Sequence, residues 1–302
     1  MTSISLLLNL SFVPLAFGEN AGKTISINTN GSKFVVPVLQ KWTEEYRKEH
    51  PEITFKIVEQ AEHSALSVVV SQQDAAETAD QKIAFTGRYV LLPVSNPKNP
   101  FFKKEKGLNK KEVKDILFER DILEDDGTAY KDKYRVNVYS RVGKNGGTPV
   151  ILANYFKTIP KRIKGKKLFG DEIYILNAIK KDSIGFAYTS LPCLYDLQTR
   201  ELNPDLSLVP LNVKSKHREK LYSSNIDHVI TLLETEEIEL VPVEFFGFLL
   251  QETVDGETIA FVRWILSKGQ QYNHELGFLK LDEQSLADQT GQLKDETLFS
   301  AK

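Results

Sequence analysis

The sequence predicts an α/β protein, because short segments with strand periodicity alternate with longer helical segments from Lys23 onward. Residues 24–28 alternate apolar and polar side chains, as a half-buried strand does. Apolar residues then recur at helical spacing over 34–46, and Pro51 ends that helix before a second strand at 53–58. A strand, a helix and a strand in this order predict parallel pairing with a right-handed crossover.

The length and composition are those of an ordinary soluble globular protein. The chain has 302 residues, of which 41% are apolar and 26% charged, and its formal net charge is −2. This length suffices for two compact lobes or for one large domain. The small net charge gives no general attraction to nucleic acid or to acidic membranes, so we expect neither as a partner.

The later segments continue the alternation of strands and helices. We expect further helices at 64–72, 109–117, 148–156, 171–180 and 256–268, and further strands at 83–94, 134–139, 184–188 and 244–251. Asn109 is the predicted N-cap of the second of these helices. Two basic runs, 161–167 and 214–220, contain no interleaved aromatic residues and are predicted to be solvated loops.

The residue types that most often carry catalysis or bind metals form no recognisable motif. Cys193 is the only cysteine, so neither an intramolecular disulfide nor a thiolate metal cluster can form. Its apolar setting predicts a buried structural thiol. The five histidines have no metal-ligand spacing and belong to no triad motif. Because paired carboxylates and an activated nucleophile are also missing from the motifs, we expect a protein that is not an enzyme and uses no cofactor.

The first eighteen residues suggest export. Residues 4–17 form an apolar run that is too short to span a bilayer. The sequence Ala-Phe-Gly at 16–18 has the small-x-small pattern of a signal-peptidase site, and polar residues follow it. We therefore expect 1–18 to be a signal peptide and the mature protein to lie in the periplasm or the cell envelope. The alternative interpretation of this run, which no Lys or Arg precedes, is a buried N-terminal helix or strand.

Two loops have a composition that suits anion binding. Residues 30–34 and 141–148 each follow a predicted strand, contain glycine with hydroxyl or amide side chains, and lead into a predicted helix. Unpaired backbone N–H groups and the helix dipole favour an anion at such a helix N-terminus. Arg141 precedes the second loop, and its guanidinium can hold an oxyanion with two hydrogen bonds. Taken alone, either loop is also a common strand-to-helix turn.

Six motifs follow one another along the chain, at 24–46, 88–118, 138–156, 185–188, 241–243 and 269–279. They include TISINTNGSKFVVPVLQKWTEEY, VSNPKNP, GFAY and VPV. In this order they resemble the periplasmic phosphate-binding proteins, which are the substrate-binding components of ABC transporters. The resemblance covers most of 24–282 and rests on the order of motifs that are each moderately specific.

The resemblance implies a two-lobed periplasmic-binding-protein fold. Each lobe is then a mixed sheet flanked by helices, and the ligand cleft lies between the lobes. Lobe 1 would comprise 21–91 and 239–302, and lobe 2 would comprise 92–238. Lobes of this kind close around a ligand by a hinge motion. The implied ligand is phosphate or another small oxyanion, the implied partner is an ABC transporter permease, and we expect a monomer.

The ligand-binding residues that the resemblance implies come from loops at helix N-termini. They are Ser32, Lys33, Phe34, Ser64, Arg141, Gly146, Gly147 and Thr148.

Several departures weaken the match to phosphate. Lys33 stands where the family has threonine, and Gly146 stands where it has serine. Residues 73–84 contain no counterpart of the family's D-x-G-x-S segment, whose aspartate accepts the phosphate proton. Each unmet hydrogen bond forfeits roughly 1–3 kcal/mol, so these losses predict weaker binding or another anion. An alternative function is an envelope interaction or sensory module that keeps the fold and binds no small molecule.

Overall fold

A computed structural model describes residues 22–61, 63–71, 82–104, 106–120, 134–142, 147–251 and 254–294. The predicted signal peptide at 1–18 and the predicted site residue Gly146 lie outside these ranges. Among the described helices, none has both the length and the apolar character needed to cross a membrane.

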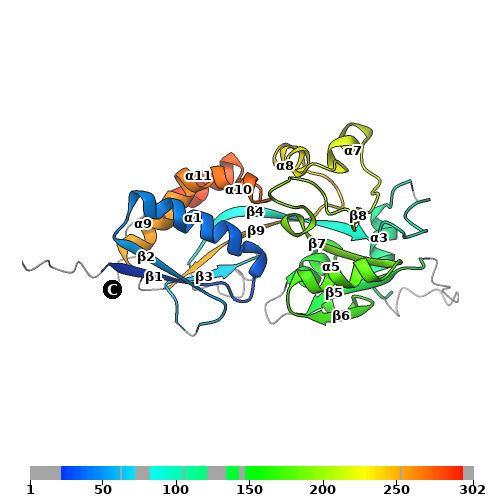
Figure 1. The fold of residues 1–302 in the computed structure, drawn as a ribbon, viewed down its shortest axis with the longest axis horizontal. Helices are drawn as coiled ribbons and strands as arrows, with labels where there is room; N and C mark the ends of the chain where they lie inside the picture. The colour runs from blue at the N-terminus through cyan, green and yellow to red at the C-terminus, as the bar shows by residue number, and fades with distance from the viewer. Residues whose placement is uncertain are drawn as a thin grey trace, which may run out of the picture.

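One path of paired strands runs through the described part of the molecule (Figure 1). Its order is β2 (Ile53–Val58), β1 (Lys23–Asn28), β3 (Leu66–Val69), β9 (Val243–Leu250), β4 (Lys82–Ser95), β7 (Gly185–Ser190), β5 (Asn137–Val142) and β6 (Lys166–Phe169). A short strand, β8 (Ser207–Leu208), pairs with β4 beside this path. Parallel pairs such as β1 with β2 occur together with antiparallel pairs such as β4 with β9, so the sheet is mixed.

The long strand β4 belongs to both halves of the molecule. Up to Val90 it pairs with β9, and from Leu91 onward it pairs with β7. We call the half that contains β1 to β3 lobe 1 and the half that contains β5 to β7 lobe 2. Figure 1 shows β4, in cyan, running from one lobe into the other. This change of partner supports a lobe boundary between 91 and 92. Both this boundary and the one between 238 and 239 are proposals.

Lobe 1 buries the apolar face of its first helix against the sheet. Its helical segments are α1 (Val36–Glu49), α9 (Gly256–Trp264), the π-helical turn η4 (Ile265–Gly269), α10 (Gln271–Glu275) and α11 (Glu283–Lys294). Trp42 of α1 is fully buried, stacks on Phe246 of β9 at 5.9 Å between ring centroids, and donates a hydrogen bond to the Gly269 carbonyl at 3.0 Å. The amphipathic helix predicted over 34–46 is therefore confirmed, starting at Val36.

Lobe 2 contains the helix whose start the sequence identifies. Its helices are α3 (Lys110–Leu117), α4 (Gly147–Tyr155), α5 (Glu172–Lys181), α6 (Leu191–Leu194), α7 (Ser215–Leu221) and α8 (Ile226–Thr235). The Asn109 side chain accepts a hydrogen bond from the Glu112 N–H, and the Glu112 carboxylate accepts one from the Asn109 N–H. This capping box confirms Asn109 as an N-cap, a role that contributes about 1 kcal/mol.

Three sequence predictions about single elements are wrong. The helix expected at 64–72 is strand β3, because its four residues are all buried between β1 and β9 and the β-branched Val68 and Val69 suit a strand. The basic run 161–167 is predicted to be a solvated loop, but its last two residues begin β6, which pairs with β5. The other basic run, 214–220, forms most of α7, a helix anchored by two buried side chains, those of His217 and Leu221. The predicted α/β class, with mixed strands flanked by helices, is confirmed.

Candidate functional site

A small cavity lies between the two lobes where the predicted anion-binding loops face each other. Its volume is about 40 Å³. One water needs roughly 10–15 Å³, so the cavity has room for a few water molecules or part of a small ligand. Lobe 1 contributes Asn30, Ser32, Phe34, Val70 and Tyr89, and lobe 2 contributes Arg141, Gly147, Thr148 and Glu172. We call this space the interlobe cavity.

A larger surface depression, of about 580 Å³, lies beside α3 and is lined by residues of lobe 2 alone, among them Lys111, Lys114 and Asp115. Neither predicted anion-binding loop reaches it. Because ligand exchange in a two-lobed protein takes place between the lobes, the interlobe cavity is the better candidate for a binding site despite its smaller volume.

The lobe 1 side of the cavity is a turn held by asparagine side chains. Asn30 and Gly31 both have positive φ, at 49° and 74°, which turns the chain sharply after β1. The Asn30 side chain donates to the Val68 carbonyl at 2.9 Å, and the Asn28 side chain accepts from the Asn30 N–H at 3.0 Å. Ser32 follows, buried and with no capping hydrogen bond of its own, directly before the 3-10 turn η1 (Lys33–Val35) that leads into α1.

Two aromatic rings close the cavity on the same side. Phe34 and Tyr89 contact each other with 5.0 Å between ring centroids. The Tyr89 hydroxyl donates to the Val70 carbonyl at 2.6 Å, which ties β4 to the end of β3. These rings exclude water from one side and so strengthen polar interactions inside the cavity.

The lobe 2 side presents a guanidinium and a helix N-terminus. Arg141, near the end of β5, reaches across the cavity and donates to the Gly31 carbonyl of lobe 1 at 3.2 Å. Gly147 begins α4 with φ of +63°, a conformation that glycine adopts without strain. Thr148 follows it and is 9% exposed. Cation, hydroxyl and helix N-terminal N–H groups therefore meet at one place, and all three are hydrogen-bond donors of the kind that an oxyanion accepts.

Glu172 is a cavity residue that the sequence analysis missed. It is 7% exposed and begins α5. One carboxylate oxygen, Oε2, accepts hydrogen bonds from the Thr189 hydroxyl at 2.7 Å and from the Ser190 hydroxyl and N–H at 2.6 and 3.1 Å. Acidic residues are common in the first turn of helices, so Glu172 did not stand out from the sequence. Val70 and Tyr89 also line the cavity, and no local pattern predicts this because only the fold brings them there. Asn30 lies in the predicted anion-binding loop 30–34, although it is not among the predicted ligand-binding residues.

Some of the predicted site residues line the interlobe cavity and others do not. Ser32, Phe34, Arg141, Gly147 and Thr148 line the interlobe cavity.

Lys33 and Ser64 are not among the residues that line the cavity. The Lys33 ammonium lies 3.1 Å from Glu59 of lobe 1 and 3.3 Å from Asp171 of lobe 2. Ser64 is buried, and its hydroxyl shares a hydrogen bond of 3.0 Å with Ser67 of β3. Lys33 therefore joins the lobes, and Ser64 supports the first residues of a strand.

The described residues hold no group of three or more His, Cys, Asp or Glu that is placed to bind a metal ion. Cys193 is packed against the core, and its thiol accepts a hydrogen bond from the Ser190 hydroxyl at 3.3 Å. Burial raises the pKa of this thiol well above its usual value, which disfavours the nucleophilic thiolate. The predicted structural role of Cys193 agrees with this environment.

Comparison with solved structures identifies the fold. A structure from Clostridium perfringens, described as a phosphate ABC transporter substrate-binding protein with bound phosphate, matches with a TM-score of 0.61 and 15% identity, over 86% of this chain and 100% of the other. An ABC-type phosphate transport receptor from Vibrio cholerae matches with a TM-score of 0.55 and 13% identity, over 86% and 100% of the two chains. No protein-family model and no curated protein matches the sequence significantly. The chain therefore has the two-lobed periplasmic-binding-protein fold, in a sequence that has diverged far from these structures.

Proposed function

We propose that this chain is an exported solute-binding protein that holds a small oxyanion, phosphate or a close relative, in the interlobe cavity and delivers it to an ABC transporter. The observation that carries the proposal is the convergence of Arg141, Thr148 and the N-terminus of α4 on one cavity, opposite Ser32 of lobe 1. All of these groups donate hydrogen bonds that suit an oxyanion. The names of the two similar solved structures support a binding role rather than catalysis.

The carboxylate of Glu172 limits which oxyanions we expect the cavity to bind. A carboxylate in a water-poor cavity repels a fully ionised oxyanion, whereas it accepts a hydrogen bond from an oxyanion that still carries a proton. The three donors on its Oε2, all from Thr189 and Ser190, fix the position of this carboxylate beside the cavity. We therefore propose that hydrogenphosphate and other protonated oxyanions bind more tightly than sulfate.

Titration calorimetry with phosphate and sulfate tests the proposal. The Arg141→Ala variant should bind phosphate about 10- to 100-fold more weakly, because a hydrogen-bonded charge is lost from the cavity. Arg135→Ala removes the same charge from an exposed position that does not line the cavity, and should leave binding unchanged. The proposal fails if the unchanged protein binds none of these anions, or if both variants bind them equally well.

One observation favours a second function, that of an envelope interaction or sensory module without a small-molecule ligand. Phe169 at the end of β6 exposes 80% of its surface, and Ile173 and Tyr174 in the first turn of α5 expose 50% and 57%. Apolar side chains grouped on a surface mark protein contacts. A pull-down from native envelope distinguishes the two functions. Recovery of a partner other than a transporter, together with a cavity indifferent to anions, favours the second.

A further inference from the structure

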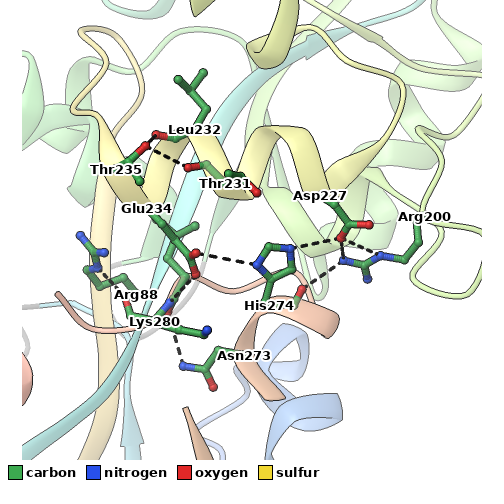
Figure 2. Close-up of polar contacts among 11 residues, drawn as sticks. Arg88, Arg200, Asp227, Thr231, Leu232, Glu234, Thr235, Asn273, His274 and Lys280 are labelled. Carbon is green, nitrogen blue, oxygen red and sulfur yellow. Dashed lines mark hydrogen bonds and ion pairs between the residues drawn. The ribbon is translucent and has the colours of Figure 1, made fainter. Parts of the chain in front are cut away.

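A second set of contacts joins the lobes away from the interlobe cavity. Figure 2 shows His274 of α10, in lobe 1, pointing between two carboxylates of α8, in lobe 2. Its Nε2 lies 3.2 Å from Asp227 Oδ1, and its Nδ1 lies 3.8 Å from Glu234 Oε2. The exposed fractions are 28% for the imidazole, 20% for Glu234 and 42% for Asp227, so solvent screens the contact with Asp227 more than the contact with Glu234. None of the three residues lines the interlobe cavity.

Arg200 of lobe 2 strengthens the same junction. On one side its guanidinium pairs with the Asp227 carboxylate, with 3.1 Å between Nε and Oδ1. On the other side it donates to two carbonyls of α10, those of His274 at 3.1 Å and Glu275 at 2.5 Å. Figure 2 shows Asp227 between Arg200 and the His274 ring. A rigid planar donor that bridges a carboxylate and a helix end fixes the relative position of both.

The backbone conformation at this junction allows the two lobes to approach each other closely. Arg200 has φ of +66°, which non-glycine residues rarely adopt, and hydrogen bonds to the Asp196 carbonyl and from the Ile226 N–H hold it there. Gly277, two residues after the end of α10, has φ of +83°, and a Cβ at this position would lie 2.9 Å from Pro192 of lobe 2. Uncommon backbone conformations gather where a structure has a function to perform.

Further charges surround the imidazole without competing for its nitrogens. Glu234 also accepts a hydrogen bond from the Lys280 N–H at 3.2 Å through its other oxygen. Arg88 of β4 donates to the Lys280 carbonyl at 2.8 Å and lies 3.7 Å from Asp282. From α1, Lys41 lies 3.8 Å from Glu275. The acids that pair with the His274 ring are Asp227 and Glu234, and the guanidinium of Arg200 pairs with the first of them.

We propose that His274, Asp227, Glu234 and Arg200 form a pH-sensitive latch between the lobes. A neutral imidazole carries one N–H and can donate to only one of the two carboxylates. A protonated imidazole donates from both nitrogens and attracts both carboxylates by charge. Acid therefore strengthens the latch, whereas the contacts of Arg200 persist at every pH at which Asp227 is ionised. This proposal does not depend on any ligand of the interlobe cavity.

Hydrogen–deuterium exchange of the full chain, corrected for intrinsic rates, tests the latch. Peptides that cover α8 and α10 should be about 2- to 5-fold better protected at pH 5.5 than at pH 8.0, the range expected for partly exposed ion pairs. Peptides that cover α3, in the same lobe but outside the latch, provide the internal reference. In His274→Gln the protection of α8 and α10 should equal the pH 8.0 value at both pH values.

The matched control is His50→Gln, which removes a histidine whose ion pair, with Glu52, stays inside lobe 1. This variant should keep the full pH dependence. If His274→Gln does not fold, Glu234→Gln keeps the Arg200 contacts and removes only the second carboxylate. It should reduce the pH dependence without abolishing it, because the contact between His274 and Asp227 remains. Equal protection of the unchanged protein at both pH values, or a loss of pH dependence in His50→Gln, overturns the proposal.

Discussion

The ammonium group of Lys33 on lobe 1 lies 3.3 Å from the carboxylate of Asp171 on lobe 2. Both residues are next to residues that line the interlobe cavity, so this ion pair joins the lobes beside the candidate site. Hydrogen bonds to Glu59 and to Asp171 raise the pKa of Lys33 above its usual value. Because two carboxylates already surround this charge, it contributes little to attracting an anion.

Lys33→Met should therefore change phosphate affinity by less than about threefold, in contrast to Arg141→Ala. Calorimetry on the two variants under one set of conditions measures the difference. Lys56→Met, on the exposed face of β2, is the control for loss of a positive charge on lobe 1. A loss of affinity in Lys33→Met as large as that in Arg141→Ala would show that the ammonium reaches the ligand.

Glu172→Gln should reverse the preference between oxyanions. The amide keeps the size of the side chain and removes the negative charge, so sulfate affinity should rise about 10-fold or more while phosphate affinity falls. Competition calorimetry with both anions measures the ratio. Glu257→Gln makes the same change in the first turn of α9, outside the cavity, and should leave the ratio as it is.

Gly147→Ala should destabilise the protein through backbone conformation alone. The residue has φ of +63°, and an added Cβ would meet only Pro149 Cδ, at 4.0 Å, so no clash contributes. The left-handed conformation costs a non-glycine residue about 1–2 kcal/mol, which corresponds to a fall in Tm of roughly 2–8 °C. Gly256→Ala, at the start of α9 with open space around it and no positive φ, should be tolerated. Thermal denaturation of both variants distinguishes the backbone effect from a general effect of adding a methyl group.

Stability should fall in acid as Asp182 takes up a proton. Burial disfavours its charge, but hydrogen bonds from the Asn137 side chain, the Ile184 N–H and the Tyr139 hydroxyl outweigh burial and hold the pKa of Asp182 below its usual value. A depressed pKa stabilises the folded state above the unfolded value, near 3.9. This contribution is lost as the pH falls through the lower folded value.

Tyr139→Phe tests the same group, because the Tyr139 hydroxyl donates to Asp182 at 2.8 Å. Burial and the contact with Asp182 raise the pKa of Tyr139 to about 12, so the hydroxyl stays a donor at neutral pH. The variant should lose about 1–2 kcal/mol at pH 7, and less once the pH has fallen through the lowered folded-state pKa of Asp182 and the carboxyl is protonated. Urea denaturation between pH 3 and 7 measures this difference. Tyr174→Phe, at an exposed position, should change stability little at either pH.

The sequence identifies the elements better than it identifies the site. The strand β1, the amphipathic helix α1 and the cap at Asn109 follow from local periodicity and hydrogen bonding, which do not depend on distant residues. For β3 the sequence wrongly predicts a helix, because the apolar run there has no clear period. Only its position between β1 and β9 decides its conformation.

The candidate site is predicted in part because its donors lie on contiguous loops. Arg141, Gly147 and Thr148 are seven residues apart or closer and belong to one strand-to-helix turn. Glu172 reaches the same cavity from another helix, and His274 meets Asp227 across 47 positions of sequence. Such contacts depend on how the lobes pack, and a single sequence contains no local pattern that reveals them.

The sheet order also sets the sequence in which the lobes can be completed on the ribosome. Lobe 2 has its strands β5, β6 and β7 once residue 190 has been made. In lobe 1, β3 and β4 both pair with β9, which is translated only at 243–250. Until then the edges of these two strands stay open to pairing with other chains. A nascent chain that stalls before 243 is therefore more prone to aggregate than the complete chain.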